Sequence, residues 1–314
     1  MIDYCKIYTN NFPLIDQRFL ENNIEDFKQF ECNGFVKCTG SIDNITFILN
    51  DHGLFIKGSP ATYYYGNNIK TLKHADLKGF IEKLSSDFNC DIKQFKVSRI
   101  DLTDNLEMEH SPILYKNYMG RCPYLQRVAD YEYNGLIYRN KSRDVLLYDK
   151  TIEMNAQRIP IPIEYQNKNL WRYEYRIKKK MHKYMNSYFI NGIDDLLRPD
   201  DFRNLVDVWE QMFKTIELIN VDSLHQLPYN YTMNYEKYLM ASGIIASGGI
   251  ANVMQDLKEQ SKVNKLAMRE YYRKVKKYKS VMDSYHKEYQ LPTSLNDELI
   301  LKLELKAQEN RDMI

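Results

Sequence analysis

The stretch from Leu170 to Lys178 constrains the fold most, because charged and apolar residues alternate along it. In a β-strand, successive side chains point to opposite faces of the sheet. One face of this strand would carry the charged residues Arg172, Glu174, Arg176 and Lys178. The opposite face would carry Trp171, Tyr173, Tyr175 and Ile177. The stretch therefore predicts a sheet with a polar face and an apolar face.

A second short strand is predicted from Arg143 to Lys150, with Tyr148 and Lys150 on one face and Leu147 and Asp149 on the other. A tyrosine beside a lysine, on a sheet with a carboxylate and several arginines, indicates phosphodiester chemistry. The hydroxyl would be the nucleophile, the cations would hold phosphate, and a carboxylate would hold a metal. The alternative is simple packing, which stays open because the chain has 26 tyrosines and strands favour them.

Length, charge and cysteines restrict the class of protein. The chain has 314 residues, enough for a full core, and a net charge of only +2, so contact with nucleic acid must come from locally clustered charge. Its five cysteines include no C-x-x-C pair, which argues against a disulfide framework and a cysteine zinc site. No signal peptide or apolar run of membrane-spanning length is present. We therefore expect a cytoplasmic protein without a membrane partner.

The periodicity of the chain predicts an α+β fold, with an antiparallel or mixed sheet, helices packed on one side, and a helical C-terminal region. A hairpin is expected over 45–57, a helix over 71–88, and strands over 58–68 and 96–105. Three consecutive tyrosines follow Thr62, and they cannot share one face of a strand, so at least one ring should be exposed. A second hairpin is expected from 132 to 148.

An acidic residue stands in the middle of the predicted strand 96–105. Asp101 shares a face with Arg99 and Thr103, while Ile100 and Leu102 would face the core. A carboxylate in such a position needs a partner. Two explanations stay open, namely a buried salt bridge to Arg99 or Arg172, and metal binding.

Two basic segments are candidates for DNA contact. The turn of the second hairpin, with Arg139, Lys141 and Arg143, would lie against a backbone phosphate. Residues 258–279 hold nine Lys and Arg against two Glu. A helix over 250–260, a break at 261–264 and a basic second helix are similar to a helix-turn-helix. The DNA contacts of that second helix would be Arg273, Lys274, Lys276 and Lys277. A solvated basic helix is the alternative.

Four motifs occur in one order along the chain. They are Gly58-Ser-x-Ala-x-Tyr-x-Tyr-Gly-Asn-Asn68, Val97-Ser-Arg-Ile-Asp101, Leu147-Tyr-Asp-Lys-x-x-Glu-Met154 and Leu170-x-Arg-Tyr-Glu-x-Arg176. With these motifs the chain resembles the gene II/X family of phage and plasmid replication proteins, which is related to the filamentous-phage replication initiator. The resemblance implies a rolling-circle initiator that nicks one strand at an origin, stays attached to the 5′ phosphate through tyrosine, and later rejoins the strand.

The resemblance also implies roles for single residues. Tyr148 would be the nucleophile and Lys150 would steady the scissile phosphate. The ligands of a divalent cation, Mg²⁺ or Mn²⁺, would be Asp101 and Glu174, with Glu153 in reserve. From the strands themselves, the cations that would contact DNA include Arg99, Arg172, Arg176 and Lys178.

The same resemblance implies an organisation and partners. Residues 1–198 would form the nicking domain, and residues 199–314 a helical C-terminal domain that contacts DNA. The expected partners are origin DNA, a host helicase and a host polymerase, in the cytoplasm of a bacterial host cell.

One feature departs from the pattern of many rolling-circle nickases, which bind metal through a His-hydrophobic-His motif. The six histidines of this chain are scattered, so a metal site would depend on carboxylates. Two other functions stay open. One is a copy-control protein that binds specific DNA without catalysis, and the other is a metal-dependent nuclease that uses water as the nucleophile.

Overall fold

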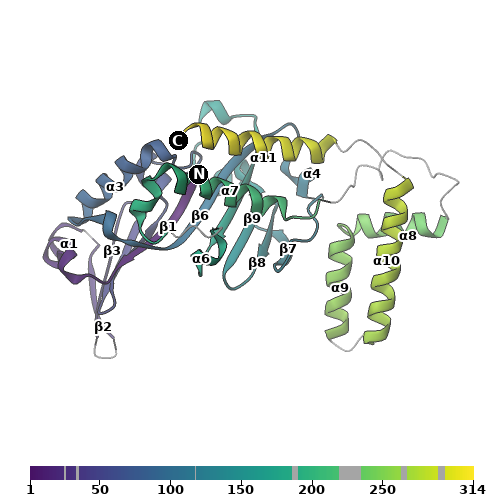
Figure 1. Ribbon diagram of the computed structural model, residues 1–314, viewed down its shortest axis with the longest axis horizontal. Coiled ribbons are helices and arrows are strands. Elements are labelled where there is room, and N and C mark those ends of the chain that lie inside the picture. The colour runs from purple at the N-terminus through teal and green to yellow at the C-terminus, as the bar shows by residue number, and fades with distance from the viewer. Residues whose placement is uncertain are drawn as a thin grey trace.

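An antiparallel sheet forms the body of the protein in this computed structural model (Figure 1). The structure describes residues 1–24, 26–32, 35–116, 118–185, 190–218, 235–262, 267–288 and 294–314. In these ranges the sheet has ten strands, in the order β2-β3-β4-β5-β1-β6-β10-β9-β8-β7. The strands are β1 (Ile2–Thr9), β2 (Lys28–Cys32), β3 (Phe35–Ile42), β4 (Ile45–Asn50), β5 (Gly53–Gly58), β6 (Lys96–Met108), β7 (Gln126–Tyr131), β8 (Gly135–Arg139), β9 (Arg143–Asp149) and β10 (Asn169–Ile177). The predicted α+β class and both predicted hairpins are confirmed.

Helices follow and interrupt the strands. They are α1 (Gln17–Asn23), α2 (Pro60–Tyr65), α3 (His74–Phe88), α4 (Pro112–Lys116), α5 (Lys150–Ala156), α6 (Met181–Tyr184), α7 (Pro199–Lys214), α8 (Tyr235–Ala246), α9 (Ile250–Lys262), α10 (Met268–Glu288) and α11 (Ser294–Asp312). The helix predicted over 71–88 corresponds to α3. Within the described ranges, no helix is both long enough and apolar enough to cross a membrane.

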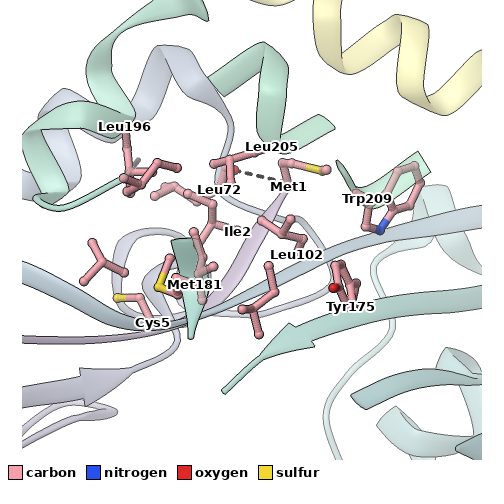
Figure 2. Packing of buried hydrophobic residues seen from close by; sticks show 14 of the residues in the cluster. Met1, Ile2, Cys5, Leu72, Leu102, Tyr175, Met181, Leu196, Leu205 and Trp209 are labelled. Atoms are coloured by element: carbon pink, nitrogen blue, oxygen red, sulfur yellow. Dashed lines mark hydrogen bonds between the residues drawn. The ribbon is translucent and has the colours of Figure 1, made fainter. Parts of the chain in front are cut away.

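The main core lies between one face of the sheet and the helices α3, α7 and α11 (Figure 1). On β10 this face carries Trp171, Tyr173, Tyr175 and Ile177, as the alternation predicts. Figure 2 shows how Leu205 and Trp209 of α7 approach Leu102 and Tyr175 of the sheet. Each fully buried side chain of this size contributes about 1.5–3 kcal/mol relative to an exposed one. The opposite face of β10 is thereby left for its charged side chains.

The strand predicted over 58–68 is wrong, because a short helix, α2, occupies its centre. The Ser59 hydroxyl caps this helix by accepting a hydrogen bond from the Thr62 amide at 3.2 Å. Pro60 occupies the first helical turn, and Gly66 ends the helix with a φ of 78°. These start and stop signals outweigh the strand preference of the three tyrosines. One exposed ring was expected, and Tyr64 is that ring.

A smaller second core joins α8, α9 and α10, which stand beyond β7 at one end of the sheet (Figure 1). Its buried residues are Ala241, Ile244, Ile245, Val281 and Met282. Both α7 and α11 belong to the main core, although they follow the boundary predicted at residue 198. That division into domains stays a prediction. The predicted pair of helices exists as α9 and α10, while part of the predicted break, residues 263 and 264, lies outside the described residues.

Candidate functional site

The polar face of the sheet gathers charged side chains where β6, β10 and β9 lie side by side. The register pairs Arg172 of β10 with Tyr148 of β9 and with Asn105 of β6. It also pairs Arg176 with Asp101. Three of the four sequence motifs therefore meet on neighbouring strands, although they are far apart in the chain.

The Tyr148 hydroxyl is held inside this charged cluster. It donates a hydrogen bond to Glu174 Oε1 at 2.6 Å, and the side chain is only 6% exposed. Burial and the neighbouring Glu174 carboxylate raise the pKa of Tyr148 well above its ordinary value. The ring lies 6.1 Å from that of Tyr133. In this arrangement Tyr148 is a protonated phenol with a carboxylate placed to accept its proton.

Glu174 is 2% exposed and accepts hydrogen bonds from two arginines as well as Tyr148. Arg172 Nε donates to Oε1 at 3.2 Å, and Arg176 Nε donates to Oε2 at 2.8 Å. Burial alone would raise the pKa of Glu174, but Arg176 and Arg172 outweigh it and lower the pKa to about 2. The carboxylate is therefore ionised at neutral pH and is a weak base while both arginines hold it.

Asp101 forms the buried salt bridge that the sequence left as one of two explanations. Arg99 donates to its two oxygens at 2.9 and 2.7 Å. Its second cation is Arg176, whose Nε lies 3.6 Å from Oδ2, and not Arg172. Burial raises the pKa of Asp101 to about 6, although both arginines oppose this shift. Arg176 consequently links the two predicted metal ligands to each other.

Arg172 and Lys150 are fully buried cations, and Asp3 and Asn68, which the sequence did not single out, contribute to holding them. Arg172 donates to the backbone oxygen of Asn68 at 2.7 Å and pairs with Asp3 at 2.7 Å. Lys150 donates to Asn68 Oδ1 at 2.9 Å and pairs with Glu153. Burial lowers the pKa of Lys150 to about 8, and the positive charge of Arg172 adds to this shift. Asn68 thus joins the first motif to the site.

Asn68 is the last residue of the first motif, and this position was the available signal for its role. Asp3 lies at the start of β1, and no pattern in the sequence marks it. Asn105 also belongs to the site, since its Oδ1 accepts from Arg172 at 3.3 Å. The sequence placed Asn105 at the end of the predicted strand, whereas β6 continues to Met108 and so brings Asn105 into the site.

The carboxylates of the site do not fit a divalent cation as they are arranged. Hard cations bind free carboxylate oxygens, whereas those of Asp101 and Glu174 accept hydrogen bonds from arginines at 2.7–3.2 Å. Glu153 is occupied by Lys150 and by Gln157, which donates at 3.2 Å. In the part of the chain that the structure describes, no three His, Cys, Asp or Glu side chains are grouped as metal ligands.

The predicted DNA-contacting cations lie in several places. Arg176, whose side chain is 27% exposed, is the accessible cation on Glu174 beside Tyr148, whereas Arg99, at 28%, contacts Asp101. In the hairpin turn, Arg139 and Lys141 are exposed. Arg143 instead donates to the Tyr175 hydroxyl at 3.3 Å. The last predicted cation of this region, Lys178, pairs with Asp144 at 2.8 Å.

The cations of α10 lie apart from this cluster. Arg273, Lys276 and Lys277 are exposed, and Lys274 is half-buried at 3.4 Å from Glu270. Tyr272, on the same helix, is also exposed. The helix therefore presents a basic surface to solvent.

Comparison with protein families gives a match over residues 37–211. The matching family model describes the N-terminal part of the replication-associated protein of the filamentous-phage gene II family. The matched range contains all four motifs and every cluster residue named above except Asp3, and it ends inside α7. A search of curated proteins gives no match.

Proposed function

The chain belongs to the gene II family of replication-associated proteins, and from this premise we propose that it nicks and rejoins one DNA strand at an origin. The observation that carries the proposal is the Tyr148 hydroxyl, 2.6 Å from the buried carboxylate of Glu174, which Arg172 and Arg176 also contact. A nucleophile, a proton acceptor and phosphate-binding cations are the groups that such a reaction requires.

In the proposed step, Tyr148 Oη bonds to phosphorus while the bond from phosphorus to the 3′ oxygen breaks. The phenolic proton passes to Glu174, and the departing 3′ oxygen takes a proton from water. The DNA then carries a 5′ phosphotyrosine, and attack by a 3′ hydroxyl reverses the step to rejoin the strand. Because no bond energy is lost to hydrolysis, the enzyme needs no external energy source for rejoining.

Binding of the DNA phosphate would make Glu174 a better proton acceptor. Glu174 has a low proton affinity while Arg172 and Arg176 hold it, and burial keeps Tyr148 protonated. Arg176 is the more accessible of the two arginines, and a phosphate would draw its guanidinium away from Glu174. The carboxylate would then become a stronger base at the moment when the substrate is in place. We assign to Lys150 the role of neutralising the buried negative charge of Glu153.

A divalent cation, Mg²⁺ or Mn²⁺, stays the proposed cofactor, but we assign no step to it. The reason is that arginines occupy the oxygens of Asp101 and Glu174. When bound, such an ion would supply charge that polarises the phosphate. The rest of the proposal depends only on residues of this chain.

Origin DNA is the proposed partner, with a host helicase and a host polymerase acting in the same process in a bacterial cytoplasm. The exposed basic surface of α10 suits contact with the DNA backbone. The same surface also favours a second candidate function, a copy-control protein that binds DNA without cutting it. Nicking separates the two candidates.

The test mixes the protein with supercoiled origin DNA in the presence of Mg²⁺. We expect a nicked product that carries covalent protein, with Tyr148 as the modified residue. Tyr148→Phe should abolish this product and leave DNA binding unchanged. The matched control is Tyr4→Phe. Tyr4 lies on β1, which pairs with β6, and its ring stacks on the guanidinium of Arg99, so this change also removes one hydroxyl from the polar face.

The outcomes separate all three functions. Binding without cleavage by the unmodified protein supports the copy-control alternative. Cleavage that survives Tyr148→Phe supports a nuclease that uses water.

A further inference from the structure

A groove separates the end of the sheet from the C-terminal helices, and it lies away from Tyr148. It is bounded by residues 121–127, which lead into β7, and by α9 and α10, and its volume is about 850 Å³. We call it the C-terminal groove. Met254, Val275 and Met282 contribute apolar side chains to its lining. The proposed nicking reaction makes no use of this groove.

We propose that the C-terminal groove binds single-stranded DNA and that Tyr124 stacks on one of its bases. This inference rests on the proposed function, because nicking creates the single strand that the groove would hold. The observations that carry it are an exposed aromatic ring, a set of cations that form no ion pair with the described side chains, and a buried arginine.

Tyr124 lies at the edge of the groove and is 91% exposed. Its backbone has a φ of 63°, which is rare for a bulky side chain and is a strained conformation. Asn140 Nδ2 donates to the Tyr124 carbonyl at 3.3 Å and holds the loop. The chain therefore keeps a large ring in solvent at a conformational cost, with no packing to offset it. Bases of a duplex are already stacked, so an exposed ring of this kind suits an unpaired base.

Cations surround the groove. Among the described residues that line it, five are Lys or Arg, namely Arg121, Arg127, Lys258, Lys262 and Lys279, against three acids. Arg127 donates to a neutral side chain, Asn252, and the other four cations form no ion pair within 4.0 Å with any described side chain. A backbone of phosphates would supply the missing partners.

Arg127 is the buried member of the set, at 8% exposure. It donates to Asn252 Oδ1 and so ties β7 to α9. Its Nε is buried and has no partner among the described residues. Asn252 is itself held by the turn before α9, since its Nδ2 donates to the Ser247 carbonyl at 3.2 Å. These contacts fix Arg127, which lines the groove, between β7 and α9.

The strand register gives the distance from this site to the nucleophile. Tyr148 lies four residues along β9 from Asp144, which pairs with Arg139, and Arg139 pairs with Gln126 of β7. With about 3.3 Å per residue and about 4.8 Å per strand, Tyr124 lies on the order of 20 Å from Tyr148. A stacked strand covers this distance with roughly six nucleotides at about 3.4 Å each. One strand can therefore reach both positions.

The test measures fluorescence anisotropy of the full-length protein with a labelled oligothymidylate of about 12 nucleotides, a length within the usual site size. A duplex of equal length is measured in parallel. All proteins carry Tyr148→Phe, so that no strand is cut. We expect Tyr124→Ala to weaken single-strand binding about 5- to 150-fold, because stacking contributes about 1–3 kcal/mol per base. Tyr124→Phe, which keeps the ring, should bind as the parent does.

The matched control is Phe30→Ala, which removes a ring that is 48% exposed on β2, at the sheet edge opposite β7, and does not line the groove. It should leave single-strand binding unchanged. The double substitution Lys258→Gln and Lys262→Gln should weaken the salt dependence of binding. The slope of log affinity against log salt concentration should fall in magnitude by about 0.7 for each phosphate that the two lysines neutralise. Cross-linking to an oligonucleotide with 5-iodouracil should modify Tyr124.

Two results would overturn the inference. One is unchanged single-strand affinity in Tyr124→Ala, and the other is an equal loss of duplex affinity in that variant. Neither result depends on nicking. If Tyr124-dependent binding is found and the protein with Tyr148 intact does not nick DNA, the inference about the groove is supported and the proposed function is wrong.

Discussion

The substitution Glu174→Gln probes the charge balance of the buried cluster. Four cations and four acids form this cluster through the contacts described above, Arg99, Lys150, Arg172 and Arg176 with Asp3, Asp101, Glu153 and Glu174. Glutamine keeps the size of the side chain but removes one charge. It leaves Arg172 with Asp3 and makes Arg99 and Arg176 share Asp101, so that one positive charge has no counterpart. Removing one partner of a buried pair costs about 3–5 kcal/mol.

The expected result is a large loss of thermal stability. With an unfolding entropy of about 2.1 cal/mol/K per residue, a chain of 314 residues loses about 1.5 °C per kcal/mol, so Glu174→Gln should melt roughly 5 to 8 °C below the parent. Calorimetry or circular dichroism at pH 7 measures this difference. The control is Glu107→Gln, which breaks an exposed pair with Lys168 at 2.7 Å. Exposed pairs contribute about 0–1 kcal/mol, so the control should melt close to the parent.

The pH dependence gives a second measurement on the same variant. The folded-state pKa of Glu174 is lowered to about 2, below the ordinary value of about 4.3 for glutamate. A group with a lowered pKa stabilises the protein above its unfolded-state pKa, and this stabilisation is lost as the pH falls through the folded-state pKa. The difference in melting temperature between the parent and Glu174→Gln should therefore become smaller as the pH falls from about 4 to about 2. Equal melting of Glu174→Gln and Glu107→Gln at pH 7 would refute the reasoning.

Three other predictions concern the carboxylates and the basic helix. Because burial raises the pKa of Asp101 to about 6, the stability of the parent relative to Asp101→Asn should fall as the pH rises from about 4 to about 6, measured by thermal melts. If a divalent cation is the cofactor, EDTA should stop nicking of origin DNA and Mn²⁺ should restore it; nicking in EDTA contradicts that requirement. Lys276→Gln with Lys277→Gln should weaken duplex origin binding and lower its salt slope by about 0.9 for each phosphate that these lysines neutralise, whereas unchanged binding would show a merely solvated helix.

Several features of the fold could be predicted from the sequence because they depend on local periodicity. The alternation from Leu170 to Lys178 predicted correctly which side chains of β10 face the core and which do not. The helix α3 and the hairpin of β8 and β9 followed from the same kind of pattern. Residues 58–68 show the limit of this approach. There the capping hydroxyl of Ser59 and the left-handed Gly66 decided for a helix against the strand preference of the tyrosines.

The sequence by itself determined the composition of the polar face, since alternation along a strand assigns each residue a side. Only the tertiary structure decided the partners of those residues. Arg176 lies between Asp101 and Glu174 because β6 and β10 pair in one particular register, and a shift by one residue would have turned every side chain to the other face. The positions of Asp3 and Asn68 beside Arg172, and of Asn252 beside Arg127, depend on contacts between distant segments. Such contacts arise from packing of the whole chain, and no local pattern contains them.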